Sequence, residues 1–226
     1  VTFVVLAVQW VDAPSSEQAG GRPAGTGADE SPGGLRLLDQ TALPQVERSL
    51  DIRTVDELVE AIQSLAVRGA PALGAAGALG VVVAMDQGAR EGWTPSELAG
   101  QVDRIRDARP TAVNLAWGVD RVRPAMTQGR DAVLAEALAL VAEDGAANRE
   151  LSRLGADWLL EHTERGRDGR PLRIVTHCNT GALATTAWGT AYGIIHDLHE
   201  RGAIELVYAD ETRPWLQGAR LTAWEL

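Results

Sequence analysis

The sequence predicts an α/β protein, in which a helical N-terminal domain with a small β-hairpin precedes the start of a parallel-sheet domain. Three observations predict this class. Between residues 54 and 161, apolar side chains recur at helical spacing behind recognisable capping residues. Strand-like apolar runs at 1–8 and 35–40 precede that stretch. After residue 171 the pattern becomes strand, helix, strand, which is typical of a βαβ unit with buried parallel strands.

The composition is that of a globular chain and narrows the choice of partners. Of 226 residues, 45% are apolar and 23% are charged, enough for one large domain or two modest ones. The formal charge is −10, from 21 basic and 31 acidic residues, and every basic residue is an arginine. A net-acidic chain without a basic cluster argues against nucleic acid or an anionic membrane as the main partner. The apolar run at 1–8 lacks a basic flank and is too short to span a membrane.

Local signals place the N-terminal elements. Residues 13–34 are rich in Pro, Ser, Gly and Ala and offer little to bury, so they predict a flexible loop inserted between two strands. The first clear helix begins at Thr54, which forms a Thr-x-x-Glu capping box with Glu57. A second capped helix begins at 94–97, and a long amphipathic helix is expected over 131–161.

Two Arg-containing turns are candidate anion sites. In the first of these motifs, Pro71 lies in the opening turn of a predicted helix, so Arg68 and the N–H groups of Gly69 and Ala70 face the same space. In the second, Arg109 precedes a proline that can open a helix. Alone, each turn is weak evidence, because a surface arginine at a helix start is ordinary. The helix after Pro71 repeats small residues, which favours close helix packing over a functional role: Gly74, Gly77 and Gly80.

A cluster of helix-breaking residues at 166–171 marks the expected domain boundary, so we assign residues 1–165 to the N-terminal domain and 171–226 to the C-terminal domain. The second domain is expected to contain a strand at 172–177, a helix at 180–201 and a strand at 204–209. Two strands are too few for a sheet covered on both faces, so this domain is expected to be incomplete.

The only cysteine, Cys178, follows the first of these strands. One cysteine excludes an intramolecular disulfide and fits a reducing, cytoplasmic compartment. A helix starting just after it would lower the thiol pKa and receive an anion, whereas the alternative is a small buried apolar side chain. Because ligands of open α/β sheets bind at the carboxyl ends of the strands, Cys178 and Gln217 are expected on the same rim. His196 and His199 lack the pattern of a zinc site, so no metal is expected.

Four motifs in order carry a more specific signal, and together they resemble the 5-methylthioribose-1-phosphate isomerase family. The likeness covers nearly the whole chain except the 13–34 loop. Relatives with the same fold include regulatory subunits of the eukaryotic translation-initiation exchange factor and archaeal ribose-1,5-bisphosphate isomerase. The motifs are Arg68-Gly69-Ala70-Pro71, then Arg109 to Leu115, then Thr176 to Gly181, and finally Tyr208 to Pro214 followed by Gln217 to Thr222.

The resemblance implies a Rossmann-like C-terminal domain and a sugar-phosphate site between the domains of a cytoplasmic homodimer. It also implies aldose-ketose isomerisation in methionine salvage, without a cofactor or metal. In this family the positions of Arg68, Gly69, Ala70, Arg109 and Gln217 bind substrate, and the position of Cys178 is catalytic. The family's catalytic aspartate would lie beyond Leu226, so the chain is expected to be truncated and inactive alone.

Two other functions remain open. A regulatory subunit of the same fold would bind a phosphometabolite or nucleotide without turning it over. A ribose-1,5-bisphosphate isomerase would need an additional cationic group for its second phosphate, whereas a methylthio group requires an apolar pocket. The identity of the residue that follows the next strand, and turnover of the two sugars, distinguish these alternatives.

Overall fold

The computed structural model describes residues 6–12 and 33–226, and its N-terminal part contains a three-stranded antiparallel sheet. The strands are β1 (Val8–Val11), β2 (Gly34–Leu38) and β3 (Ser49–Ile52), in the order β1-β2-β3. The hairpin of β1 and β2 was predicted; β3 was not, because its four residues, Ser-Leu-Asp-Ile, form no apolar run. Most of the predicted 13–34 loop lies outside the described residues, and Gly34 already belongs to β2.

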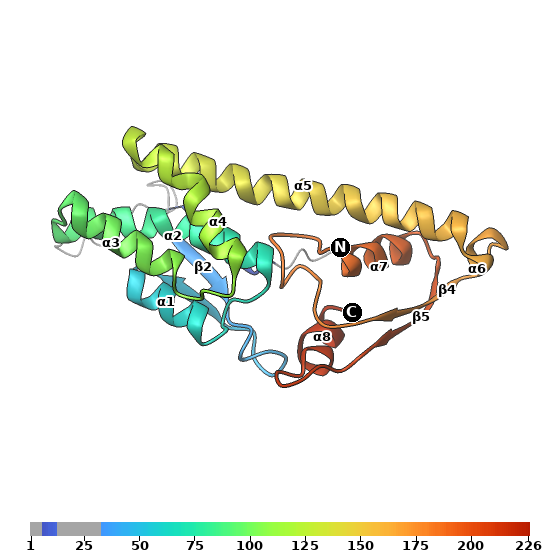
Figure 1. Cartoon of the computed structure of the whole chain (residues 1–226). Helices are drawn as coiled ribbons and strands as arrows, with labels where there is room; N and C mark the ends of the chain where they lie inside the picture. The colour runs from blue at the N-terminus through green and yellow to red at the C-terminus, as the bar shows by residue number, and fades with distance from the viewer. Residues whose placement is uncertain (1–5, 13–32) are drawn as a thin grey trace, which may run out of the picture.

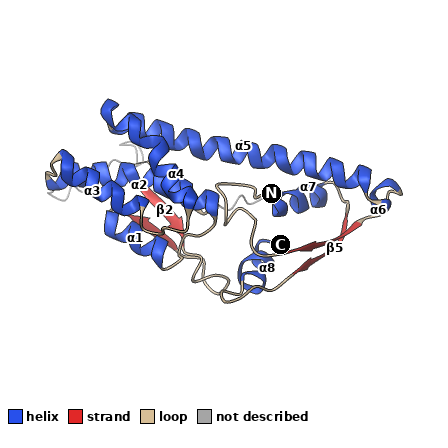
Figure 2. Cartoon of the chain, in the orientation of Figure 1, coloured by secondary structure: helices blue, strands red, loops and turns tan. Residues whose placement is uncertain are grey.

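Helices form most of the rest of the N-terminal part (Figure 2). Both predicted capping boxes are present, at Thr54 with Glu57 and at Thr94 with Glu97. The proline at the first turn of α2 is also confirmed. The helices are α1 (Val55–Gln63), α2 (Ala70–Glu91), α3 (Pro95–Arg106), α4 (Val113–Val122), the 3-10 helix η1 (Arg123–Gln128), α5 (Arg130–His162) and α6 (Glu164–Arg167).

Helix α2 is the centre of the main apolar core. It is long and apolar enough to cross a membrane, but 83% of its apolar window is buried inside the structure, as in the core helix of a folded domain. Its glycines allow neighbouring side chains and backbone to approach, as predicted. A Cβ atom at Gly77 would lie 2.9 Å from Leu115, and one at Gly80 would lie 2.3 Å from Leu58. The closest approach is to α4, where a Cβ atom at Gly118 would lie 2.1 Å from the carbonyl oxygen of Gly74.

Helix α5 spans the whole molecule and packs against both of its parts (Figure 1). Its first half contributes Val133, Ala137 and Leu140 to the main core, which α2 dominates. Its second half contributes Ala156 to a smaller core beneath α7 and β4. The two parts of the chain therefore share one helix, and the predicted boundary at 166–171 stays a prediction.

The C-terminal part contains the predicted βαβ unit. Strands β4 (Leu172–Thr176) and β5 (Ile204–Ala209) are parallel, and α7 (Ala191–Glu200) connects them. The chain ends in a π-helical turn, η2 (Gly218–Thr222), and the short helix α8 (Ala223–Glu225).

One element differs from the prediction. The helix expected over 180–201 begins only at Ala191, and residues 177–190 form a loop. This loop packs against other elements instead of against its own helix, because Thr186 bonds to Asp144 of α5 and the carbonyl of Ala184 accepts from the N–H of Ala72 in α2. Long-range contacts thus override the local helical spacing.

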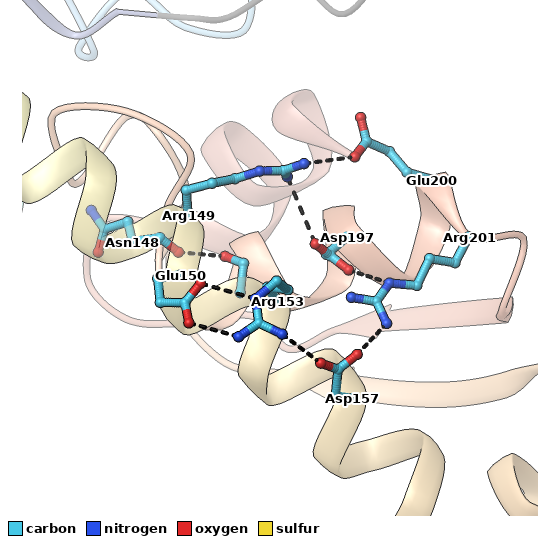
Figure 3. Close-up of polar contacts among 9 residues, drawn as sticks. Asn148, Arg149, Glu150, Arg153, Asp157, Asp197, Glu200 and Arg201 are labelled. Carbon is cyan, nitrogen blue, oxygen red and sulfur yellow. Dashed lines mark hydrogen bonds and ion pairs between the residues drawn. The ribbon is translucent and has the colours of Figure 1, made fainter.

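Ion pairs fasten α7 to α5 (Figure 3). Asp197, which is buried, pairs with Arg201 at 2.5 Å and with Arg149 of α5 at 3.7 Å. Arg201 also reaches Asp157 of α5 at 2.5 Å. The guanidinium of Arg149 lies 3.7 Å from the ring centroid of Trp188, within the loop before α7. A network of this kind fixes orientation more than it adds stability.

We predict that Gly118→Ala destabilises the protein by about 1 to 3 kcal/mol, the usual cost of inserting a methyl group into a filled core. The added Cβ atom would force α2 and α4 apart at Gly74. Urea denaturation measures the change. Gly100→Ala is the matched control, because no atom lies within 4 Å of the new methyl group on α3, and there the substitution should stabilise by about 0.5 to 1 kcal/mol. Equal effects of the two substitutions would contradict the packing assignment.

Candidate active site

The start of α2, which carries Arg68 and Gly69, contacts the loop 177–190, which carries Cys178. Gly69 has a φ of +96°, and a Cβ atom there would lie 2.3 Å from the carbonyl oxygen of Ala184. Only glycine permits both this conformation and this approach. The N–H of Ala72 donates to the same carbonyl oxygen at 3.3 Å. The turn that carries Arg68 is therefore held against the loop that carries Cys178.

Three arginine side chains create a positive region here without carboxylate partners. The side chains of Arg68 and Arg109 are partly buried and have no hydrogen-bond or ion-pair partner among the described residues. Burial lowers the pKa of Arg68, and the positive charges of Arg220 and Arg109 lower it further, whereas a negative Cys178 would act in the opposite direction. These four groups are therefore electrostatic neighbours. Unpaired, partly desolvated guanidinium groups are typical of an anion site.

Arg220 differs from the other two arginines because backbone carbonyls occupy its N–H groups. It donates to the carbonyls of Thr41 at 2.8 Å, Gln40 at 3.2 Å and Leu43 at 3.2 Å. Arg220 thus bonds the helical segment η2 to the loop after β2, and its positive charge adds to that of Arg68 and Arg109. The sequence analysis missed this residue, although its motif had been singled out.

Cys178 lies in the loop just after β4 and is partly buried. Its φ is +56°, in the left-handed region that a residue with a side chain rarely adopts. The hydroxyl of Thr222 donates to its backbone carbonyl at 2.8 Å. The expected helix N-terminus beside the thiol is absent, because α7 begins at Ala191.

The acidic residues near Cys178 have different environments. Glu225 accepts from the Asn179 side chain at 2.5 Å and from the N–H of Leu183 at 3.0 Å, while burial raises its pKa above the ordinary glutamate value. Asp210, at the end of β5, lies 3.6 Å from His177. Neither Asn179 nor Glu225 was predicted as part of the site; the only signal was the presence of Asn179 within the cysteine motif.

Gln217 lies at the start of the last helical segment, just before Gly218. Its amide oxygen is buried and has no hydrogen-bond partner among the described residues. A buried acceptor without a partner is uncommon and is consistent with a ligand-binding role. The N–H groups at this helix start are not available to an anion, because Glu211 accepts from Gly218 at 2.9 Å and from Ala219 at 3.1 Å.

A large cavity of the protein does not coincide with the arginines. It has a volume of about 940 Å³ and lies between α7 and β5, lined by Tyr192, His196, Leu206 and Val207 among others. It shares Ala182 and Glu225 with the neighbourhood of Cys178, but none of the three arginines lines it. Within residues 6–12 and 33–226, no group of three His, Cys, Asp or Glu side chains could hold a metal ion. The cluster of unpaired arginines with Cys178 is therefore the candidate site.

Comparison with known proteins identifies the family. Residues 66–226 match the profile of the Initiation factor 2 subunit family. The chain belongs to this family. All the predicted site residues lie within the matched region: Arg68, Gly69, Ala70, Arg109, Cys178 and Gln217.

Curated relatives in this family carry isomerase names, which confirms the resemblance found in the motifs. A Nocardia farcinica protein named as a probable bifunctional methylthioribose-1-phosphate isomerase/methylthioribulose-1-phosphate dehydratase is 54% identical over 195 residues, 86% of this chain and 35% of that protein. A Pseudomonas syringae methylthioribose-1-phosphate isomerase is 46% identical over 200 residues, 85% of this chain and 54% of that protein. The chain thus spans about half the length of most curated relatives it matches.

Solved structures of the family share the fold and confirm its α/β class. The delta subunit of translation initiation factor eIF-2B from A. fulgidus superposes with a TM-score of 0.71 at 42% identity, covering 85% of this chain and 56% of that one. The 5-methylthioribose 1-phosphate isomerase of Pyrococcus horikoshii OT3 superposes with a TM-score of 0.71 at 33% identity, covering 85% and 54%.

In this family member, the second arginine turn differs in detail from the prediction. Pro110 does not open α4, which begins three residues later at Val113, with Ala112 as the residue before it. The turn is closed by a bond from the N–H of Ala112 to the carbonyl of Arg109 at 2.9 Å. Arg109 therefore lies in a turn and not at a helix N-terminus.

We predict that Glu211→Gln lowers the melting temperature at pH 7. Backbone N–H donors from Thr212, Ala219 and Gly218 hold the pKa of Glu211 below its ordinary value of 4.5. Because its folded pKa is lowered, its contribution is complete above pH 4.5 and is lost as the pH falls through the folded pKa. The difference in melting temperature between the two proteins should therefore shrink on acidification.

The control for this prediction is Glu161→Gln, which neutralises an exposed glutamate on α5. A pH-dependent loss of the same size in both variants would show that net charge, and not the cap of the last helix, causes the effect.

Proposed function

We propose that the protein is an aldose-ketose isomerase that converts 5-methylthioribose 1-phosphate to 5-methylthioribulose 1-phosphate in methionine salvage. One observation carries the proposal. Arg68 and Arg109, which have no carboxylate partners among the described residues, lie within electrostatic range of the only thiol of the chain. The isomerase names of relatives at 45–54% identity support it.

The positive region suits the phosphate of such a substrate. A phosphate monoester carries up to two negative charges, and guanidinium groups bind it through charged, often bidentate hydrogen bonds. Arg68 and Arg109 have free N–H groups for these bonds, and Gly69 lets the turn that carries Arg68 approach the backbone of Ala184, because it has no side chain. Gln217 supplies an unpaired amide oxygen that can accept from a sugar hydroxyl.

The chemistry requires an acid and a base but no external oxidant, metal or cofactor. The bond between C1 and the ring oxygen breaks, and that oxygen takes up a proton. Hydrogen then moves from C2 to C1, while the C2 hydroxyl loses its proton and becomes the ketone. In this proposal Cys178 acts as one of the two proton-transferring groups. The other, which the resemblance assigns to an aspartate after Leu226, stays a prediction.

We further propose that the protein works in the cytoplasm as a homodimer, with a Rossmann-like second domain. A single free cysteine fits a reducing compartment. Exposed apolar side chains on α5, Leu154 at 52% and Trp158 at 57%, support association with a second copy. Size-exclusion chromatography with light scattering tests the dimer, and a monomer across micromolar concentrations would contradict it.

Arg68→Ala and Arg109→Ala should each weaken substrate binding by about 1.5 to 3 kcal/mol, the scale of a hydrogen bond to a charged group. Neither side chain makes a bond within the described structure, so the melting temperature should change little. Isothermal titration with substrate and a thermal melt measure the two effects. Arg104→Ala is the control, because this exposed arginine pairs with Asp56 away from the site. A lowered melting temperature with unchanged affinity would show that the arginines are structural.

Cys178→Ser should lower kcat by about 10²- to 10⁴-fold, the range that a positioned proton-transferring group contributes, with a smaller effect on KM. Turnover of 5-methylthioribose 1-phosphate by the protein without substitutions is the primary test. Full activity of the serine variant would remove Cys178 from the mechanism, and Asp210 would be the next residue to substitute.

The second candidate is a regulatory subunit that binds a phosphometabolite or nucleotide without turnover. The 42% identity to a solved protein named as an eIF-2B subunit favours considering it. If the protein without substitutions binds the sugar phosphate but does not isomerise it, this alternative gains support. A third candidate, ribose-1,5-bisphosphate isomerase, would gain support if the bisphosphate were the only sugar turned over.

A further inference from the structure

The conformation of Cys178 depends on contacts from a distant part of the chain. Its positive φ of 56° is unfavourable for a residue with a Cβ atom, so surrounding contacts must hold it. Within the loop 177–190, local hydrogen bonds involve Thr180 and later residues, such as the bond from the N–H of Thr190 to the carbonyl of Thr180 at 2.8 Å. The contacts to residues 178 and 179 come instead from the C-terminal helical turn.

Thr222 is the first of these contacts. It is 2% exposed, and its hydroxyl donates to the carbonyl of Cys178 at 2.8 Å. This bond fixes the peptide plane that follows the cysteine, one of the two planes whose relative orientation sets the backbone conformation of Cys178. No other hydrogen bond to this carbonyl is recorded within the described residues.

Glu225 is the second. One carboxylate oxygen accepts from the side chain of Asn179 at 2.5 Å, and the other accepts from the N–H of Leu183 at 3.0 Å. The carboxylate occupies the space beside Gly181, where a Cβ atom would lie 2.3 Å from it. The hydroxyl of Tyr192 donates to the backbone carbonyl of Glu225. The carboxylate therefore bonds to the loop on both sides of Gly181, at Asn179 and at Leu183.

The segment that carries these two residues is itself fixed. Arg220 bonds it to the carbonyls of Thr41 and Leu43, and Glu211 caps its start. Thr222 and Glu225 are three residues apart, so both lie on the side of this helical segment that faces the cysteine loop. The segment therefore holds the cysteine loop at a fixed position relative to the N-terminal part of the chain.

We propose that Thr222 and Glu225 are positioning residues, which hold Cys178 in its left-handed conformation beside Arg68 through the Cys178 carbonyl and the Asn179 side chain. Their role in turnover rests on the proposed isomerase function. Loss of either contact lets the loop relax, and a thiol displaced by about 1 Å from its reacting atom loses most of its rate advantage.

The first experiment measures the thiol directly and requires no assumption about activity. Because Cys178 is the only cysteine, its alkylation by iodoacetamide under native conditions reports one site. We expect Thr222→Val to raise the alkylation rate about fivefold to tenfold, the factor expected for a conformational equilibrium that loses one hydrogen bond. Thr222→Ser keeps the hydroxyl and should stay near the parent rate. Ala223→Ser, at an exposed neighbouring position, is the matched control.

The second experiment tests the other contact from both partners. Glu225→Ala and Asn179→Ala should each raise the alkylation rate, and the double variant should show no increase beyond Glu225→Ala, because that change already removes the bond that Asn179→Ala removes. Melting temperatures confirm that the variants are folded. If Glu225→Ala does not fold, Asn179→Ala carries the test, since it leaves the buried carboxylate its bond from Leu183.

Turnover then separates this inference from the function on which it rests. In an active isomerase, Thr222→Val should lower kcat about tenfold or more with little change in KM, and Thr222→Ser should restore it. If the parent protein lacks isomerase activity, the alkylation rates still test the positioning role. A folded Thr222→Val that alkylates at the parent rate, or a Thr222→Ser that behaves like Thr222→Val, would overturn the proposal.

Discussion

The close approach of Gly69 to the backbone of Ala184 is the constraint on which the site depends. A side chain at Gly69 would collide with this backbone, and its φ of +96° suits only glycine. The contact joins two loops that are more than a hundred residues apart in sequence. It places Arg68, at the start of the central core helix, within electrostatic range of Cys178. Without it, the arginine turn and the cysteine loop would be two unrelated surface features.

Helix α5 makes that contact possible by joining the two cores of the molecule. Its first half packs in the core around α2, and its second half packs in the core beneath α7 and β4. Charged side chains on α7, led by the buried Asp197, fix the orientation of the second part on this helix (Figure 3). The position of the cysteine loop relative to α2 is thus set by a continuous helix and a specific ion-pair network.

The electrostatics of the site contrast with those of the chain as a whole. The formal charge is −10, which by itself gives no sign of an anion site. Elsewhere in the described residues, most arginines pair with carboxylates, as Arg106 does with Asp120 at 2.9 Å. At the site, Arg68 and Arg109 have no such partner in the part of the chain that the structure describes, and the N–H groups of Arg220 bond to carbonyl oxygens that carry no net charge. Local distribution of charge, and not its sum, therefore makes the site positive.

The sequence by itself determined the features that depend on neighbouring residues. The capping boxes at Thr54 and Thr94, the proline at the start of α2, the small-residue packing face at Gly74 to Gly80 and the βαβ pattern are all short-range signals, and the structure contains them. The motifs also indicated Arg68, Arg109, Cys178 and Gln217 as site residues. Only the tertiary structure decided that residues 177–190 are a loop, and that Thr222 and Glu225 form hydrogen bonds to it. The Ala-rich spacing favours a helix there, but bonds to α2, α5 and the C-terminal turn outweigh that weak local preference, and contacts between residues so far apart leave no periodic pattern in the sequence.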